Sequence, residues 1–191
     1  MRAATVMIMA ALLVFSGNAY AGDAWKQAVV DSKKMVKEMG MGLKSALKEA
    51  IKNSGPAEAI YVCRSIAPQK AAEISEKHGA SIRRVSLKLR NPSNAPDRVE
   101  KKILTQMEKD HAAGALRPAY IAIETGADGA RRLRFLKPIV TGKVCLNCHG
   151  PKGSLAPGVA EALEKNYPGD MATGYTVNQV RGAFSVSYPI D

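Results

Sequence analysis

The sequence predicts an α+β protein, in which an antiparallel sheet of about four to five strands is flanked by helices. One long helical pattern lies near the N-terminus, and four short segments alternate apolar and polar residues as half-buried strands do. Of the 191 residues, 46% are apolar and 24% are charged. This composition suffices for one domain with a hydrophobic core and excludes disorder as the main state.

Helical patterns dominate the first part of the chain. Residues 23–53 are predicted to form one long N-terminal helix, which ends at Asn53-Ser54-Gly55-Pro56. Its apolar residues recur at spacings of three, four or seven, and lysines cover the other face: the apolar set is Trp25, Val29, Val36, Met39, Leu43, Leu47 and Ile51. A second helix follows over 56–67, Pro68 breaks or restarts it, and Gly79 closes the next helical piece.

The remaining elements are predicted from short-range signals. Residues 85–89 alternate as a strand does, and turn residues mark 91–96 as a loop. Asp97 is a good N-cap for a helix that runs to about Ala113. Further along, we expect strands over 118–124 and 131–138 joined by a turn at 126–129, then a short helix over 158–166 and a closing strand over 181–188.

The N-terminus has the three parts of a secretory signal peptide. A positive charge at Arg2 precedes an apolar run over 3–15, and small residues follow at Ala19 and Ala21. The run is shorter than the roughly 20 residues that span a bilayer, which favours cleavage after Ala21 over a membrane anchor. We therefore expect an exported, periplasmic protein that does not span the membrane after cleavage, with residues 22–191 as a single domain.

The chemistry-bearing motif is Cys145-Leu146-Asn147-Cys148-His149, a C-x-x-C-H. In this pattern two thiols form thioether bonds to the vinyl groups of haem, and the histidine binds the iron. On a helical turn all three side chains project to one face, which suits that geometry. Three alternatives remain: a zinc site that recruits Cys63 or another histidine, a thioredoxin-like redox pair, and a plain disulfide. The motif favours one covalently attached haem c with its iron.

Cys63 is the third cysteine, and an odd number excludes a pure disulfide scaffold. In a helix its i±3 and i±4 neighbours are Ala59, Ile60, Ile66 and Ala67, so it points inward. It is then either a small buried hydrophobe or the second axial ligand of the iron, opposite His149. We expect His78 and His111, at predicted helix ends, to be solvated surface residues. Met39, Met107 and Met171 are expected to fill the core.

Several blocks of the sequence resemble one family of exported single-haem c-type proteins with a PAS-like fold. The blocks are Ala59 through Pro68, Leu87 through Pro96, the pentad with Gly150, and Gly174-Tyr175 followed by Val180 through Val186. The resemblance covers nearly the whole chain after residue 21. It implies a PAS-like antiparallel sheet, haem attached at Cys145 and Cys148, and axial ligation by His149 and Cys63.

The chain is basic, with a formal charge of +11. One cluster comprises Arg83, Arg84, Lys88 and Arg90, and a second comprises Arg131, Arg132, Arg134, Lys137 and Lys143. Nucleic acid is an improbable partner in the periplasm, and most of these side chains are expected to form a solvated face. Such a face also suits docking to an acidic redox partner or to anionic lipid. Arg90 and Arg181 are the candidates for pairing with haem propionates.

Two functions fit these expectations. The first is a periplasmic electron-transfer protein, in which the iron cycles between ferric and ferrous states with His149 and Cys63 bound. The alternative is a haem-based redox or gas sensor acting through a partner, in which reduction weakens the Cys63 bond and nitric oxide or carbon monoxide binds instead. No catalytic residues are expected, because the sequence shows no acid–base arrangement and a six-coordinate iron would exclude substrate.

Overall fold

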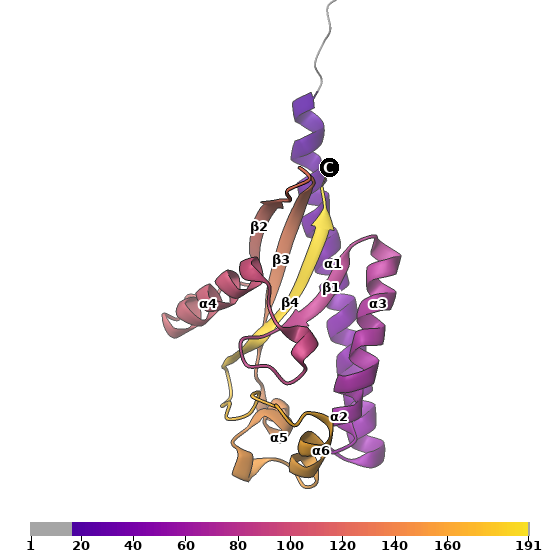
Figure 1. The fold of residues 1–191 in the computed structure, drawn as a ribbon, viewed down its shortest axis with the longest axis vertical. Helices are drawn as coiled ribbons and strands as arrows, with labels where there is room; N and C mark the ends of the chain where they lie inside the picture. Colours follow the sequence, from indigo (N-terminus) through magenta and orange to yellow (C-terminus); the bar gives the residue numbers. More distant parts are fainter. Residues whose placement is uncertain (1–16, 191) are drawn as a thin grey trace, which may run out of the picture.

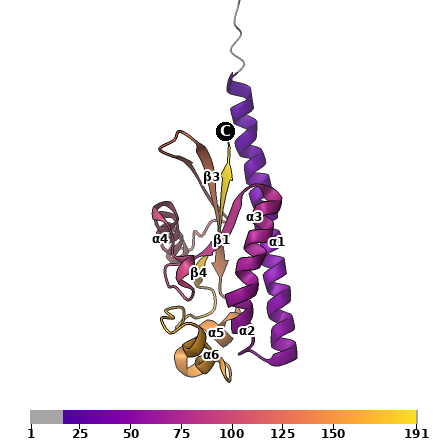
Figure 2. The same ribbon diagram turned by 45° about the vertical axis from the view of Figure 1, so that its right-hand side comes forward.

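The computed structural model describes residues 17–190, with side chains from residue 24 onward. A four-stranded sheet lies between helices: α1 and α3 cover one face, and α4 lies against the other (Figure 1; Figure 2). The α-helices are α1 (Gly17–Ser54), α2 (Ala59–Tyr61), α3 (Ala67–His78), α4 (Arg98–Ala112), α5 (Leu146–His149) and α6 (Val159–Asn166). This arrangement confirms the predicted α+β class, the flanked antiparallel sheet and the long N-terminal helix.

All neighbouring strands of the sheet are antiparallel, in the order β1-β4-β3-β2. The strands are β1 (Ser81–Val85), β2 (Tyr120–Thr125), β3 (Arg131–Val140) and β4 (Val180–Pro189). The predicted turn between β2 and β3 is present, and Gly129 supplies its positive φ of 81°. The pairing of β3 with β4 shifts where Ile139 faces Gly182 and Val140 faces Val180, so Arg181 is an extra residue in β4.

Each face of the sheet has its own core. Against α1 and α3, side chains such as Met35, Ile82 and Phe135 are 3% exposed or less and form one cluster. Against α4, Leu104, Met107 and Leu136 form a second cluster. Together they fix the sheet between two layers, and α4 begins where predicted, with Asp97 accepting from the Glu100 N–H in a capping box.

The strand predicted over 85–89 was wrong in position. β1 spans Ser81–Val85, and only its last residue falls in the predicted segment. Two adjacent arginines, Arg83 and Arg84, occupy its centre and hide the alternation, because their long side chains lie half-buried against other elements. Beyond Val85 the chain leaves the sheet, and the Ser86 hydroxyl accepts a hydrogen bond from the Lys88 N–H at 3.2 Å.

Of the two outcomes predicted for Pro68, a break or a restart, the structure shows a restart, because α3 begins at Ala67 with Pro68 in its first turn. The backbone stays helical from α2 through a π-helix over Val62–Ile66 into α3, where Pro68 occupies the first turn. In the π-helix the Ala67 N–H bonds the Val62 carbonyl, five residues earlier. Pro68 has no N–H to offer the Cys63 carbonyl, which accepts instead from Arg84 at 3.4 Å. Gly79 ends α3 in the left-handed conformation, as predicted.

Three predictions about single side chains were wrong. Trp25 and Met171 are 39% and 55% exposed, so neither is a core residue, whereas Met39 and Met107 are buried as predicted. His78 is half-buried and pairs with Glu38 at 3.3 Å, at the end of α3 remote from Cys63. The predicted signal peptide falls mostly on residues 1–16, outside the described residues.

Candidate functional site

The C-x-x-C-H motif lies at the end of the molecule where α5 and α6 meet α2 (Figure 1). A 3₁₀ turn over Lys143–Cys145 leads directly into α5, so the motif is helical as predicted. Gly150 stops this helix against its own first turn, where a Cβ would lie 2.6 Å from the Leu146 carbonyl oxygen. Glycine is therefore required directly after His149.

A remote segment holds the motif in place. The N–H of Gly174 donates to the Gly150 carbonyl at 2.8 Å, and the N–H of Tyr175 donates to the His149 carbonyl at 2.9 Å. This segment, residues 170–175, follows α6 in the sequence. The motif is thus clamped by backbone bonds that no local pattern in the pentad predicts.

His149 is held as a neutral ring with one nitrogen engaged. Its Nδ1 lies 2.7 Å from the carbonyl oxygen of Ala172, a distance that requires the proton on Nδ1 as donor. The Nε2 atom then carries the lone pair that a metal ion needs. Burial lowers the pKa of His149 to about 3, with further contributions from the nearby Arg90 and Arg181 cations. The ring is therefore neutral at neutral pH, with its proton on Nδ1 and the lone pair of Nε2 available to a metal ion.

Cys148 and Cys63 lie in one neighbourhood. Burial raises the pKa of Cys148 to about 11; the charge of Arg90 opposes this, and Cys63 and Cys145 add to it. Cys148 packs against a cluster of Ile60, Val159, Leu163 and Tyr167 that joins α2 to α6. Because Ile60 lies one turn before Cys63, this packing brings the π-helix next to the motif. Cys63 and Cys145 both lie close enough to act electrostatically on Cys148, which directly precedes His149 in the motif.

Arg90 is buried at the base of the site. Its side chain is 5% exposed and pairs with Asp170 at 3.0 Å. The same guanidinium donates to the Cys148 carbonyl at 2.6 Å, so it ties the motif to the 170–175 segment. Its Nη1 atom is buried without a partner among the described residues. Pairing with a propionate, as predicted, would have to use this one nitrogen, because the others are engaged.

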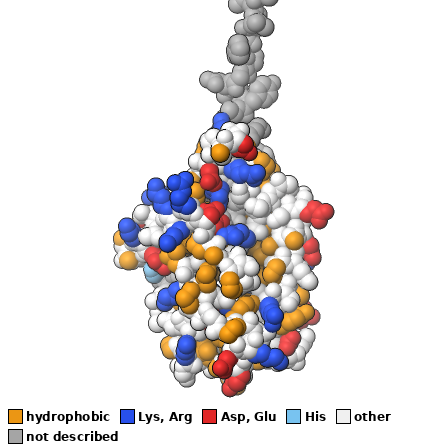
Figure 3. Space-filling model, viewed as in Figure 1, with side chains coloured by type: hydrophobic (Ala, Val, Ile, Leu, Met, Phe, Trp, Pro, Cys, Tyr) orange, Lys and Arg blue, Asp and Glu red, His pale blue; other side chains and the backbone are white. Residues whose placement is uncertain are grey.

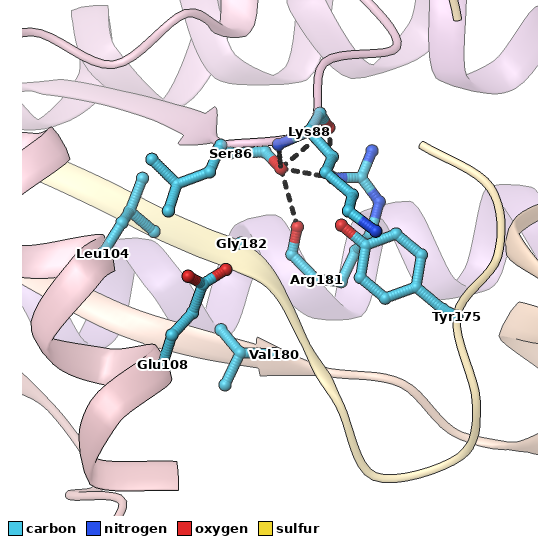
Figure 4. Close-up of a pocket in the computed structure, with 9 residues that line it drawn as sticks. Ser86, Lys88, Leu104, Glu108, Tyr175, Val180, Arg181 and Gly182 are labelled. Carbon is cyan, nitrogen blue, oxygen red and sulfur yellow. Dashed lines mark hydrogen bonds between the residues drawn. The ribbon is translucent and has the colours of Figure 1, made fainter. Parts of the chain in front are cut away.

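Arg181 lies behind His149 rather than beside an open surface. Its Nη1 donates to the Ser86 hydroxyl at 2.6 Å and to the Lys88 carbonyl at 3.2 Å. The guanidinium also stacks over Tyr175, 5.6 Å from the ring centroid. Figure 4 shows these side chains close together. They line a hollow of about 10 Å³, the space of a single water. The predicted pairing of Arg181 with a propionate therefore has competition from protein partners.

Two buried hydrogen-bond donors at the site have no acceptor among the described residues. They are Arg90 Nη1 and the hydroxyl of Tyr167, both donors. Buried donors are nearly always paired in native proteins, so this end of the molecule is shaped for a group that supplies acceptor atoms. A porphyrin with two carboxylates, thioether-linked to Cys145 and Cys148, would supply them.

Neither a cluster of metal-ligating side chains nor a disulfide occurs among the described residues. Among residues 17–190, no group of three or more His, Cys, Asp or Glu side chains could hold a metal ion. All three cysteines are free thiols. A larger hollow of about 390 Å³ lies on the sheet near Arg83, Glu100 and Arg134, but neither cysteine nor histidine lines it.

The basic clusters are only partly a solvated face. Arg90 and Arg134 are buried, and Arg83 pairs with the buried Glu100 at 2.8 Å. Arg83, Arg90 and Arg134 therefore hold elements together and depart from the expected solvated face, whereas Lys88, Arg132, Lys137 and Lys143 are exposed as expected. On the face seen in Figure 3, lysines and arginines are interspersed with acidic and apolar side chains. Within the described part of the chain, no helix is long and apolar enough to cross a membrane.

The sequence missed the residues that support the motif. Asp170, Ala172 and Tyr167 were not singled out, and their contacts depend on segments more than 20 residues away. Tyr175 belonged to a family-like block, which was the one available signal. The fold and the site together define a class: an α+β protein whose C-x-x-C-H motif is clamped at one end of an antiparallel sheet.

The comparisons with known proteins give that class a family. A family model described as Tll0287-like matches residues 22–189, so the chain belongs to the Tll0287-like family. A crystal structure of the cyanobacterial heme-protein Tll0287 is similar at 26% identity and a TM-score of 0.61. The match covers 87% of this chain and 95% of that one. A search of the curated proteins found no match.

Proposed function

We propose that this chain is a periplasmic monohaem c-type cytochrome that transfers electrons. Cys145 and Cys148 hold the haem by thioether bonds, and His149 and Cys63 are the axial ligands. The single observation that carries the proposal is the 2.7 Å bond from His149 Nδ1 to Ala172, which leaves Nε2 free to bind iron. The likeness to a structure named as a heme-protein supports the choice of haem over zinc.

The residues of the chain divide the work at this site. When bound, haem supplies one-electron chemistry at its iron. The carbonyl of Ala172 fixes the tautomer and the plane of His149. Arg90 bonds Asp170 and the Cys148 carbonyl, so it ties the motif at Cys148 to the 170–175 segment. The apolar cluster of Ile60, Leu163 and Tyr167 packs against Cys148 and partly buries its thiol.

Attachment is tested on protein made in a host that matures c-type haem. We expect a red protein with a Soret band that survives acid–acetone extraction, because thioether bonds resist it. A colourless protein from the same host would overturn the proposal. Mass spectrometry on the same sample also tests cleavage after Ala21 and export.

A sensor remains the second candidate, because Cys63 lies in a π-helix. π-helices occur frequently at functional sites, and in this one the Cys63 carbonyl accepts a hydrogen bond from Arg84 of β1. A segment of this kind suits a ligand that is released on reduction. Carbon monoxide separates the two functions: a ferrous form inert to it supports electron transfer, and rapid binding supports sensing.

A further inference from the structure

The bulge in β4 delivers one charged side chain to the back of His149. The register of β4 on β3 skips Arg181, which is the extra residue between Val180 and Gly182. Bulges of this kind redirect a side chain that the regular pleat would place elsewhere. At this bulge, Arg181 Nε lies 3.3 Å from Nδ1 of His149.

The backbone around the bulge is built to permit this approach. Gly182 has a φ of 155°, and a Cβ there would overlap the carbonyl oxygen of Val85. Glycine therefore allows the end of β1 to close onto β4 and brings Ser86 to Arg181. The Ser86 hydroxyl donates to the Arg181 carbonyl at 2.8 Å and accepts from its Nη1. Ser86 therefore holds Arg181 at two points, its backbone carbonyl and its guanidinium (Figure 4).

Arg181 acts on His149 as a charge rather than as a hydrogen-bond donor. The proton on Nδ1 is already required by the 2.7 Å bond to Ala172. The Arg181 Nε–H therefore faces another N–H and has no lone pair to receive it. Burial lowers the pKa of Arg181, yet a guanidinium stays protonated in proteins. A positive charge is thus fixed behind the ring that would bind iron.

We infer that Arg181 is a positioning residue that raises the reduction potential of the haem iron through His149. This inference rests on the proposed function and names a determinant of it. A nearby positive charge disfavours the more positive, ferric state, so it favours the ferrous one. The effect opposes that of the Cys63 thiolate, which favours ferric iron. Arg181 thereby moderates the low potential that His/Cys ligation would otherwise produce.

The test is a redox titration of purified, haem-loaded protein followed by its absorption spectrum. Arg181→Gln removes the positive charge, and Arg181→Lys keeps the charge but replaces the planar guanidinium with an ammonium group. Arg132→Gln, at an exposed position on β3 that pairs with Pro189, removes one charge elsewhere. At a fixed applied potential, Arg181→Gln should change the ferrous-to-ferric ratio about three- to tenfold toward ferric, where tenfold equals about 59 mV. Arg181→Lys should recover most of this change, and Arg132→Gln should shift the ratio less than twofold.

A potential for Arg181→Gln that matches Arg132→Gln, or lies above wild type, would overturn the inference. The ferric spectra of Arg181→Gln and wild type must be the same. A difference would mean that an iron ligand had changed, which would shift the potential for another reason. If Arg181→Gln loads no haem, Ser86→Ala decides, since it keeps the charge but frees the guanidinium. We then expect a smaller shift toward ferric, and an unchanged potential overturns the inference. Wild-type protein without covalent haem would instead refute the proposed function.

Discussion

The molecule contains two regions that are stabilised in different ways. In the first, formed by the sheet with α1, α3 and α4, apolar side chains interlock and a capped helix closes the second face. In the second, formed by α2, the π-helix, α5 and α6 with residues 86–90 and 141–179, helices are short and polar clamps fix the chain. Two of the four unpartnered buried polar atoms of the described residues, Arg90 Nη1 and Tyr167 Oη, lie in this second region at the motif. The other two, Ser32 Oγ and Arg134 Nε, lie in the first region. The first region is therefore distinguished by its apolar packing, and the second by polar clamps around the C-x-x-C-H motif.

Replacing both attachment cysteines should separate the two regions most clearly. In Cys145→Ala/Cys148→Ala we expect complete loss of covalent haem, because no thioether can form. The sheet region should remain folded, since its clusters contain neither cysteine. The haem-stained band on a denaturing gel measures attachment, and amide hydrogen exchange measures order in each region. Equal loss of protection in the two regions would contradict this division.

Truncating a core side chain of the sheet should have the opposite effect: it should lower the stability of the protein without preventing haem attachment. Phe135 is 1% exposed in the cluster beneath α1, so Phe135→Ala should lower the free energy of unfolding by about 3–5 kcal/mol. Ile123, on the neighbouring strand, is 55% exposed, and Ile123→Ala should change it by less than about 0.5 kcal/mol. Denaturant unfolding measures both. Protein that remains folded should carry haem as wild type does, and selective loss of haem would argue against two separate regions.

The same division explains what the sequence could predict. Three confirmed predictions depend only on residues close in the sequence: the N-cap at Asp97, the helix end at Gly79 and the turn at 126–129. β1 was misplaced because Arg83 and Arg84 are half-buried by contacts with other elements rather than by alternation. The bulge at Arg181 and the π-helix around Cys63 depend on segments that are remote in the sequence. The pentad identified the motif, but the carbonyl that orients His149 lies 23 residues away.

Cys63 connects the two regions, because its carbonyl in the π-helix accepts a hydrogen bond from Arg84 of β1. Cys63→Ala should shift the ferric spectrum and raise the reduction potential, because it removes an electron-donating thiolate. Covalent haem should be retained, since both attachment cysteines remain. Ser65→Ala, in the same π-helix, serves as the control and should leave the spectrum unchanged. A Cys63→Ala spectrum identical to wild type would refute ligation and leave Cys63 as a packing residue.

The smallest expected effect belongs to the cap that joins α4 to the sheet. Burial by itself would raise the pKa of Asp97, but bonds from the Glu100 N–H and Arg134 lower it below 3.8. Asp97→Ala should therefore cost about 1 kcal/mol at neutral pH, and Asp97→Asn only a few tenths because the amide still caps. Because the folded pKa is lowered, this contribution is complete above the ordinary pKa and is lost as pH falls through the folded one. Denaturant unfolding between pH 7 and 2 measures it, and a difference between wild type and Asp97→Ala that does not shrink in acid would contradict the cap. The haem spectrum should stay the same in both variants, since Asp97 caps α4 in the sheet region and does not belong to the motif.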